Sequence, residues 1–294
     1  MAFAHGKMAG TMLKKLVRSA LRAVAKVPWV RKLVLHPAVH DRLRAWPPFE
    51  GIFAGGWHFR HPFDRRYQVE TSGFVQPEQL ESSPHEAGRK YAIYAGSQPS
   101  IIRTALNALP ALPDCTFIDL GCGKGRPLLV ASEYPFRSLI GFELTPSLVL
   151  QARKNAAVIS RRFAQRAPIA IEQQDASQFP VPEGNAVIFL YNPFGEPVVA
   201  RVAARIEAAL ANGGGTKFVI YYNPIHGACF DASRLLSRFF AANLAYASEE
   251  RGYGPDARDS VVIWQGRGTA RAHPHADASI KVHESGLRAE ILSY

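Results

Sequence analysis

The sequence is poor in features that mark several common protein classes. It contains only three cysteines, Cys115, Cys122 and Cys229, which are too few and too scattered for a disulfide framework or a zinc site. No stretch reaches the roughly 18 uninterrupted apolar residues that a membrane-spanning helix requires. These absences argue against a disulfide-rich secreted domain and a membrane span. We therefore expect a cytoplasmic protein, with peripheral membrane attachment as the alternative.

Acidic residues are absent from residues 1–40, which contain eight lysines and arginines. The net charge is +11, but the remainder of the chain holds 27 basic against 24 acidic residues. Residues 11–26 separate apolar from basic positions at helical spacing, so we expect a basic helical extension over residues 1–45. This extension could pack on its own domain, lie on an anionic membrane surface or bind an acidic partner. The nearly neutral remainder counts against nucleic acid.

Residues 46–110 are expected to form a cover ahead of the main domain. A passage rich in proline, tryptophan and glycine, residues 46–57, indicates a linker or irregular structure. His58 and His61 are three residues apart, but no carboxylate or cysteine stands at ligand spacing. We predict no metal site.

A glycine turn between an apolar strand and a helix is the central feature of the sequence. Residues 115–120 read as a strand, and Gly121, Gly123 and Gly125 follow before a helix that Pro127 can begin. Such a turn needs glycine because the backbone takes positive φ and approaches a ligand closely. A second strand, residues 138–142, ends on Glu143, whose carboxylate can accept both hydroxyls of a ribose. The pattern predicts a nucleotide site.

Asp119 stands directly before this turn. Its carboxylate would repel a pyrophosphate, whereas it would attract an ammonium or sulfonium group. The third glycine also comes one residue earlier than in the usual dinucleotide pattern. Both features favour a positively charged nucleoside.

The segment from Asp119 to Gly125, followed by Glu143 and Asp175, resembles the successive motifs of class I S-adenosylmethionine-dependent methyltransferases. The resemblance covers roughly residues 114–266. It implies S-adenosylmethionine as cofactor, with Asp175 accepting the adenine amine and the backbone of Ala176 contacting an adenine nitrogen. Alternatively, Asp175 caps the following turn. The resemblance also implies a lid in which Tyr91 or Tyr94 touches the cofactor, although either could be an ordinary core or surface tyrosine.

The expected fold is α/β and Rossmann-like. The main domain, residues 111–266, should hold a seven-stranded, mostly parallel sheet that ends in an antiparallel hairpin. Later strands are expected at residues 169–172, 186–190, 217–222, 245–249 and 260–264, with a helix at 232–240. Residues 267–294 are expected to form a polar, poorly ordered tail.

Asn192, Pro193 and Phe194 follow the fourth strand and form the candidate catalytic motif. The Asn192 side-chain oxygen and a backbone carbonyl of Asn192 or Pro193 could accept the N–H groups of an amine. The Phe194 ring could contact the substrate or the developing cation. The motif resembles that of amino methyltransferases shortened by one proline, although Asn-Pro can also form a simple turn.

Asn223, Pro224 and His226 end the next strand and should face the same site. His226 is a candidate base, although a lone histidine is more often structural.

The most favoured function is therefore methyl transfer to an amine nitrogen of a protein lysine or a small amine. The alternatives are an RNA methyltransferase that uses the basic extension as an anchor, and a protein that binds the cofactor without catalysis.

Overall fold

The computed structural model describes residues 60–75, 94–251, 253, 258–267, 270 and 272–282. The predicted basic extension, the passage at 46–57, His58, Tyr91 and residues 283–294 lie outside the described residues. Among the described residues, no helix is both long enough and apolar enough to cross a membrane.

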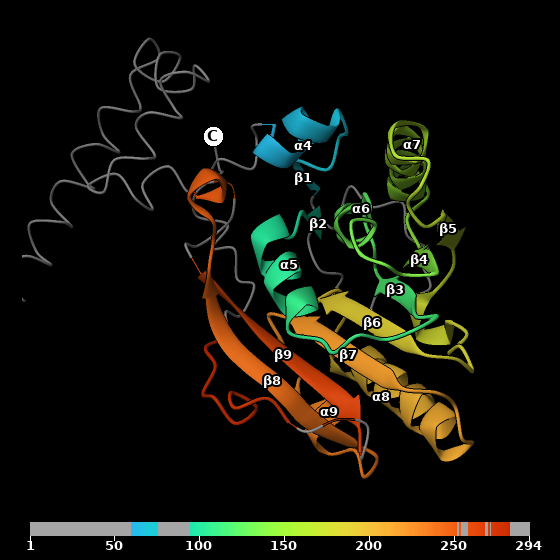
Figure 1. Cartoon of the computed structure of the whole chain (residues 1–294), viewed down its shortest axis with the longest axis vertical. Coiled ribbons are helices and arrows are strands. Elements are labelled where there is room, and N and C mark those ends of the chain that lie inside the picture. The colour runs from blue at the N-terminus through green and yellow to red at the C-terminus, as the bar shows by residue number, and fades with distance from the viewer. Residues whose placement is uncertain are drawn as a thin grey trace, which may run out of the picture.

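The predicted seven-stranded sheet is confirmed, with the order β5-β4-β3-β6-β7-β9-β8 (Figure 1). Strands β3 to β7 pair in parallel, and β9 runs antiparallel to both of its neighbours, β7 and β8. The strands span Thr116–Leu120 (β3), Ser138–Glu143 (β4), Ile169–Gln173 (β5), Ala186–Tyr191 (β6), Lys217–Tyr222 (β7), Leu236–Ala245 (β8) and Arg258–Gly266 (β9). The parallel strands therefore bring their carboxyl ends to one edge of the sheet.

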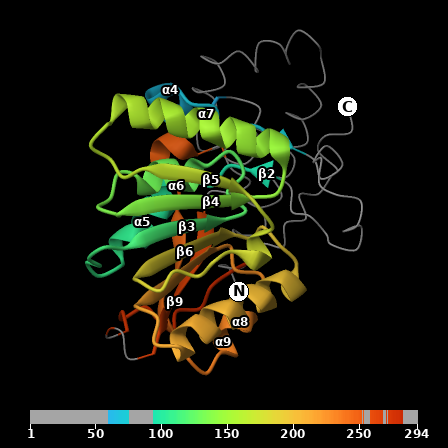
Figure 2. The ribbon, with the colours of Figure 1, turned by 90° about the vertical axis from the view of Figure 1, so that its right-hand side faces the viewer.

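Helices cover both faces of the sheet (Figures 1 and 2). One face packs against α5 (Pro99–Asn107), α6 (Arg126–Ala131) and α7 (Pro146–Arg162), with α4 (Pro62–Tyr67) beside them. The other face packs against α8 (Glu196–Ala211) and α9 (Ala228–Asp231). Because β3 and β7 are covered on both faces, all their residues are buried, and their sequences are mostly apolar rather than alternating.

Proline marks the start of four helices around the sheet. Helices α5, α6, α7 and α8 each have a proline in the first or second position, where the missing N–H would have no intrahelical partner. Helices α6, α7 and α8 directly follow β3, β4 and β6, so their first turns lie at the carboxyl edge of the sheet.

The predicted antiparallel hairpin is present, but its first strand and the preceding helix were placed incorrectly. Residues 232–240 are not helical: the short helix α9 ends at Asp231, and β8 begins at Leu236 and ends at Ala245. A bulge between Arg238 and Phe240 shifts the register with β9. An extra residue in a strand breaks the two-residue alternation, which is why this apolar stretch resembles a helix in sequence.

Part of the predicted tail is attached to the sheet. The amide N–H of His273 donates to Phe239 O at 2.9 Å, and the N–H of Ala241 donates to His275 O at 2.9 Å. The Asn243 side chain donates to Ser279 O at 2.9 Å. The described residues 272–282 therefore pack along the outer edge of β8, which differs from the poor order expected for them.

Candidate active site

The three glycines of the central turn all have positive φ, with values of 74° for Gly121, 53° for Gly123 and 85° for Gly125. Close packing reinforces the need for glycine at two of them. A Cβ atom on Gly121 would lie 2.6 Å from Pro193 Cβ, and one on Gly123 would lie 2.3 Å from Tyr94 Cε2. The turn therefore depends on glycine for its backbone conformation and for its contacts with two other segments.

Asp119 lies in β3 just before the turn and is 1% exposed. Its Oδ2 atom has no hydrogen-bond partner among the described residues. Burial, and to a smaller extent the neighbouring Glu143, raise the pKa of the Asp119 carboxyl well above its ordinary value. A buried carboxylate oxygen without a partner is costly, so it is suited to a ligand that brings a positive charge or a donor.

Glu143 ends β4 and holds the glycine turn. Its Oε2 accepts from Gly123 N at 2.9 Å, and its Oε1 accepts from Thr145 N at 2.9 Å. The carboxylate is 8% exposed. Each carboxylate oxygen can accept more than one hydrogen bond, so this arrangement is compatible with a further contact to ribose hydroxyls.

Asp175 and Ala176 follow β5, the next strand in the sheet. Asp175 Oδ1 accepts from Ser177 N at 2.8 Å and caps the 3-10 turn η5 (Ala176–Gln178). The capping alternative is therefore present in the structure. Asp119, Glu143 and Asp175 thus stand at the carboxyl end of three adjacent strands, as the sequence predicts for a nucleoside site.

The candidate catalytic motif lies against the glycine turn. Asn192 follows β6, is 9% exposed and has a φ of 40°. Pro193 and Phe194 are the neighbours of Gly121: the Phe194 Cζ atom lies 3.5 Å from the position of a Cβ on that glycine. The structure therefore brings the predicted catalytic motif and the predicted cofactor turn together.

Tyr221 contacts this motif and was not identified from the sequence. Its hydroxyl donates to Asn192 Oδ1 at 3.2 Å, and burial raises the pKa of Tyr221 above its ordinary value. The hydroxyl consequently keeps its proton and fixes the orientation of the Asn192 amide. An amide oxygen has two lone pairs and can accept a second hydrogen bond.

Tyr94, in the short strand β2 (Tyr94–Ala95), covers the glycine turn. Its ring lies against Gly123, and its hydroxyl donates to Thr71 O at 2.8 Å. Desolvation raises the pKa of Tyr94, so it also remains protonated. Tyr94 therefore stands at the turn, in a position from which it can contact a bound nucleoside.

A buried arginine ties the cover to the same turn. Arg126 begins α6 and is 3% exposed. Its guanidinium donates to Thr71 Oγ1 at 2.6 Å, to Thr71 O at 2.9 Å and to Ser97 O at 3.0 Å. A Cβ on Gly96 would lie only 2.5 Å from Arg126 Cζ. The turn and the cover therefore interlock, because a glycine in each accommodates a side chain of the other.

The cover segment at residues 70–72 is held from several sides. The Asp64 carboxylate in α4 accepts from the backbone N–H groups of Thr71 and Ser72, both at 2.7 Å. Lys124, in the glycine turn, donates to Ser72 O at 2.7 Å. Asn155 of α7 bonds both the N–H and the carbonyl of Glu70, at 2.9 Å each. The contacts of Asp64 are 7 and 8 positions apart, whereas those of Lys124 and Asn155 are 52 and 85 positions apart, and no local sequence pattern predicts the latter two.

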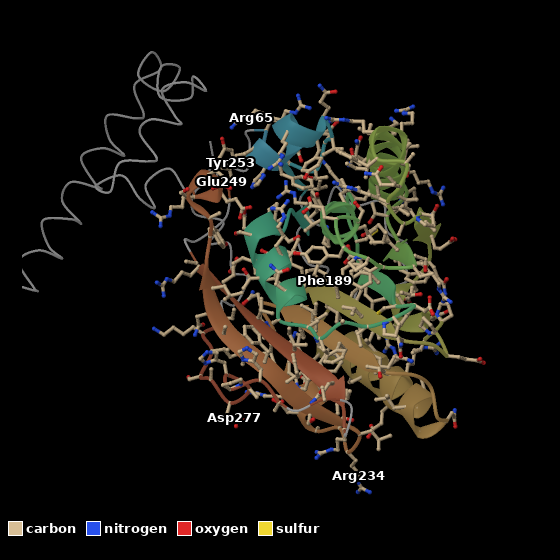
Figure 3. All side chains as sticks on the ribbon, viewed as in Figure 1. Arg65, Phe189, Arg234, Glu249, Tyr253 and Asp277 are labelled. Carbon is tan, nitrogen blue, oxygen red and sulfur yellow. The ribbon has the colours of Figure 1, made fainter. Side chains whose placement is uncertain are left out.

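The His61 ring caps a helix and packs against neighbouring side chains. Its Nδ1 accepts from Phe63 N at 3.0 Å and caps α4, while its Nε2 lies 3.1 Å from Gln98 Oε1. The Tyr253 ring meets it edge-on at 5.1 Å. Figure 3 shows Tyr253 near Arg65 of α4, and Arg65 donates to the Tyr253 hydroxyl at 3.3 Å. This cluster anchors α4 to the segment after β8.

Neither a comparison with protein families nor one with curated proteins gives a match. Among solved structures, an RNA methyltransferase from Salinibacter ruber in complex with S-adenosyl-L-homocysteine is 19% identical, with a TM-score of 0.42; the match covers 60% of this chain and 97% of that one. Precorrin-6y C5,15-methyltransferase from Geobacter metallireducens GS-15 is 13% identical, with a TM-score of 0.42, and the coverage is 64% and 94%. The [4+2]-cyclase SpnF is 14% identical, with a TM-score of 0.43, and the coverage is 57% and 80%.

The strand order and the reversed strand β9 decide the fold class. The fold is Rossmann-like, as the sequence predicts. The three solved structures include two methyltransferases and a cyclase, so at these identities the likeness assigns no reaction to this chain. Function must therefore come from the residues of the site.

Proposed function

We propose that the protein is an S-adenosylmethionine-dependent methyltransferase whose acceptor is an amine nitrogen of a protein lysine or a small amine. The buried and unpartnered Oδ2 of Asp119, beside the glycine turn, is the observation that carries the proposal. A phosphate group beside this carboxylate would be repelled. An ammonium or sulfonium group would satisfy it.

The other residues at this edge of the sheet suit the same nucleoside. Glu143 would accept the ribose hydroxyls while it continues to hold Gly123 and Thr145. Asp175 and Ala176, one strand further, would contact the adenine. Tyr94 would cover the ligand from the side of the glycine turn. When bound, S-adenosylmethionine supplies an electrophilic methyl carbon on a cationic sulfur.

The acceptor must present a lone pair in line with that methyl carbon. Positioning supplies most of the rate in such a transfer, because no acid or base is needed to activate a neutral amine. The Asn192 oxygen, fixed by the Tyr221 hydroxyl, can accept one N–H of the amine, and a backbone carbonyl of Asn192 or Pro193 can accept another. The Phe194 ring can stabilise the positive charge that develops on nitrogen.

Transfer of a labelled methyl group from S-adenosylmethionine to a cell extract tests this proposal. The extract is separated into protein, RNA and small-molecule fractions after reaction, and the labelled atom is identified by mass spectrometry. We expect nitrogen-linked label in protein or small molecules. Label in RNA would support the RNA methyltransferase instead, and binding of S-adenosylhomocysteine without transfer to any fraction would support a non-catalytic protein.

A further inference from the structure

A lysine stands inside the glycine turn, but its ammonium group is directed to the cover. Lys124 lies between Gly123 and Gly125. A lysine in a glycine-rich turn can bind phosphate oxygens. Here, the Lys124 Nζ atom donates to Ser72 O at 2.7 Å and lies 3.5 Å from Glu70 Oε1. The side chain is only 13% exposed, so the ammonium is held against residues of the cover.

The same ammonium group lies over the ring of Tyr94. The distance from Lys124 Nζ to the ring centroid is 5.5 Å, and a cation within about 6 Å of a centroid is attracted to the ring. The ring packs on Gly123 so closely that a Cβ atom there would overlap it. The Tyr94 hydroxyl donates to Thr71 O at 2.8 Å. Three contacts therefore fix the Tyr94 ring: with the backbone of the turn, with the Lys124 ammonium and with the Thr71 carbonyl.

The segment that accepts from Lys124 is also attached to Tyr94 through the backbone. Ser72 precedes the short strand β1 (Phe74–Val75), which pairs antiparallel with β2. Val75 and Tyr94 are register partners in this pairing. Lys124 therefore holds both strands of the cover, β1 through Ser72 and β2 through the Tyr94 ring.

We propose that Lys124 is a positioning residue for the nucleoside cofactor: it holds the Tyr94 ring over Gly123 and does not touch the cofactor itself. This inference rests on the proposed function. Gly123 N donates to Glu143 Oε2 at 2.9 Å, so a ring fixed on Gly123 stands near the carboxylate that would accept the ribose hydroxyls. A phosphate-binding role would require the Lys124 ammonium to leave its partners in the cover.

The energetic effect of Lys124 is preorganisation of the cofactor site. A side chain that is already fixed in the free protein loses less conformational entropy when a ligand packs against it. Without the Lys124 ammonium, Tyr94 would keep more freedom, and cofactor binding would have to restrict it. The loss should appear in the affinity for the cofactor and in the KM for S-adenosylmethionine. It should not appear in kcat, because the ring takes no part in methyl transfer once the cofactor is bound.

Replacement of Lys124 by methionine removes the charge and keeps an unbranched side chain. Lys124→Met loses the donor to Ser72 and the cation over the Tyr94 ring. Lys124→Arg retains a cation and several donors and should rescue binding. Lys154→Met is the matched control, because Lys154 is an exposed lysine of α7. Tyr94→Leu removes the ring and serves for a double-mutant cycle with Lys124→Met.

The measurements are the Kd for S-adenosylhomocysteine by calorimetry, and the KM for S-adenosylmethionine and kcat of transfer to the extract fraction that the wild-type protein labels. We expect Lys124→Met to raise Kd and KM about 5- to 20-fold with kcat within about twofold, the effect of losing one hydrogen bond and one cation–ring contact. Lys124→Arg should stay within about threefold of the wild type, and Lys154→Met should change neither Kd nor KM. In the Tyr94→Leu background, Lys124→Met should change Kd by less than about twofold, because Lys124 acts through the ring.

Amide hydrogen exchange of the ligand-free proteins gives a second measurement, which needs no Tyr94 variant. Exchange over residues 70–75 and 94–95 should be faster in Lys124→Met than in the wild type, because the cover has lost its attachment to the turn. It should be unchanged in Lys154→Met.

Four results would overturn the inference. One is a wild-type Kd in Lys124→Met. Another is additive effects of Lys124→Met and Tyr94→Leu, which would show that Lys124 acts independently of the ring. The third is unchanged exchange in the cover. The fourth is binding of ATP to the wild-type protein that Lys124→Met abolishes, which would make Lys124 a phosphate ligand.

The same experiments separate this inference from the proposed function. A wild-type protein that binds no S-adenosylhomocysteine would overturn the proposed function, and this inference with it. A wild-type protein that binds it but transfers no label would overturn methyl transfer alone, and the Kd values and exchange rates would still test the role of Lys124.

Discussion

Replacing Asp119 by asparagine removes the negative charge at the centre of the site while keeping the size of the side chain. The carboxylate is 1% exposed, and its Oδ2 has no partner among the described residues. A charge-assisted hydrogen bond to a ligand ammonium contributes about 1.5–3 kcal/mol. We therefore expect Asp119→Asn to weaken the binding of S-adenosylhomocysteine, which carries this ammonium, about 10- to 100-fold.

The raised pKa of Asp119 adds a dependence on pH. Binding a cation favours the ionised carboxylate, so the wild-type protein should release a proton on binding wherever free Asp119 is still protonated. Its affinity should rise with pH up to the raised pKa of Asp119 in the free folded protein, and then level off. Asp119→Asn should show neither effect.

The ligand-free protein should show the complementary trend. Protonated Asp119 contributes stability at low pH, and this contribution is lost as the pH rises through the raised pKa of the folded state. The Tm of the wild-type protein should therefore fall relative to that of Asp119→Asn over this pH range. Calorimetric titrations in two buffers of different ionisation enthalpy measure the proton release. Equal affinities for both proteins at every pH, with no proton released, would refute the reasoning.

Three further perturbations test the surroundings of the site. Glu143→Gln should weaken S-adenosylhomocysteine binding by about 1.5–3 kcal/mol, because the ribose loses a charged acceptor; calorimetry that finds unchanged affinity would remove Glu143 from the site. Arg126→Met should lower the free energy of unfolding in urea by about 3 kcal/mol, since it leaves the buried oxygens of Thr71 and Ser97 without their donor, and wild-type stability would contradict the interlock. Deletion of residues 1–40 should abolish sedimentation with anionic vesicles if this segment binds membranes, an idea that fails if the full-length protein ignores such vesicles.

The parts of the fold that the sequence predicts well are those with strong local signals. Strands β3, β6 and β7 are mostly apolar, and each is followed by a turn or helix start that glycine or proline marks. The glycine turn and Glu143 could be identified together because the motif that contains them spans only about 25 positions. The grouping of the acids at one sheet edge could be predicted because parallel strands bring their carboxyl ends to the same edge.

Strand β8 was misplaced because tertiary pairing overrides its local pattern. Phe239 and Phe240 are adjacent, and the bulge between Arg238 and Phe240 interrupts the alternation that identifies a strand. The segment 272–282 illustrates a similar effect, since its polar sequence gives no sign that its backbone pairs with β8.

The cover could not be predicted because its contacts are distant in sequence and mostly involve backbone atoms. Arg126 donates to carbonyls 29 and 55 positions away, and Asn155 to one 85 positions away. The contact of Tyr221 with Asn192 has only a weak signal in the sequence. Tyr221 and Tyr222 are adjacent in β7 and project to opposite faces of the sheet, both of which are covered. Each buried hydroxyl therefore needs a hydrogen-bond partner on its own face.

A crystal structure with S-adenosylhomocysteine bound is the most direct test of the central claim. We predict the ribose hydroxyls on Glu143, the ligand ammonium on Asp119 Oδ2, and the adenine beside Asp175 and Ala176. A complex in which these three acids face no part of the nucleoside, or in which NAD occupies the same edge with its pyrophosphate on the glycine turn, would contradict the assignment.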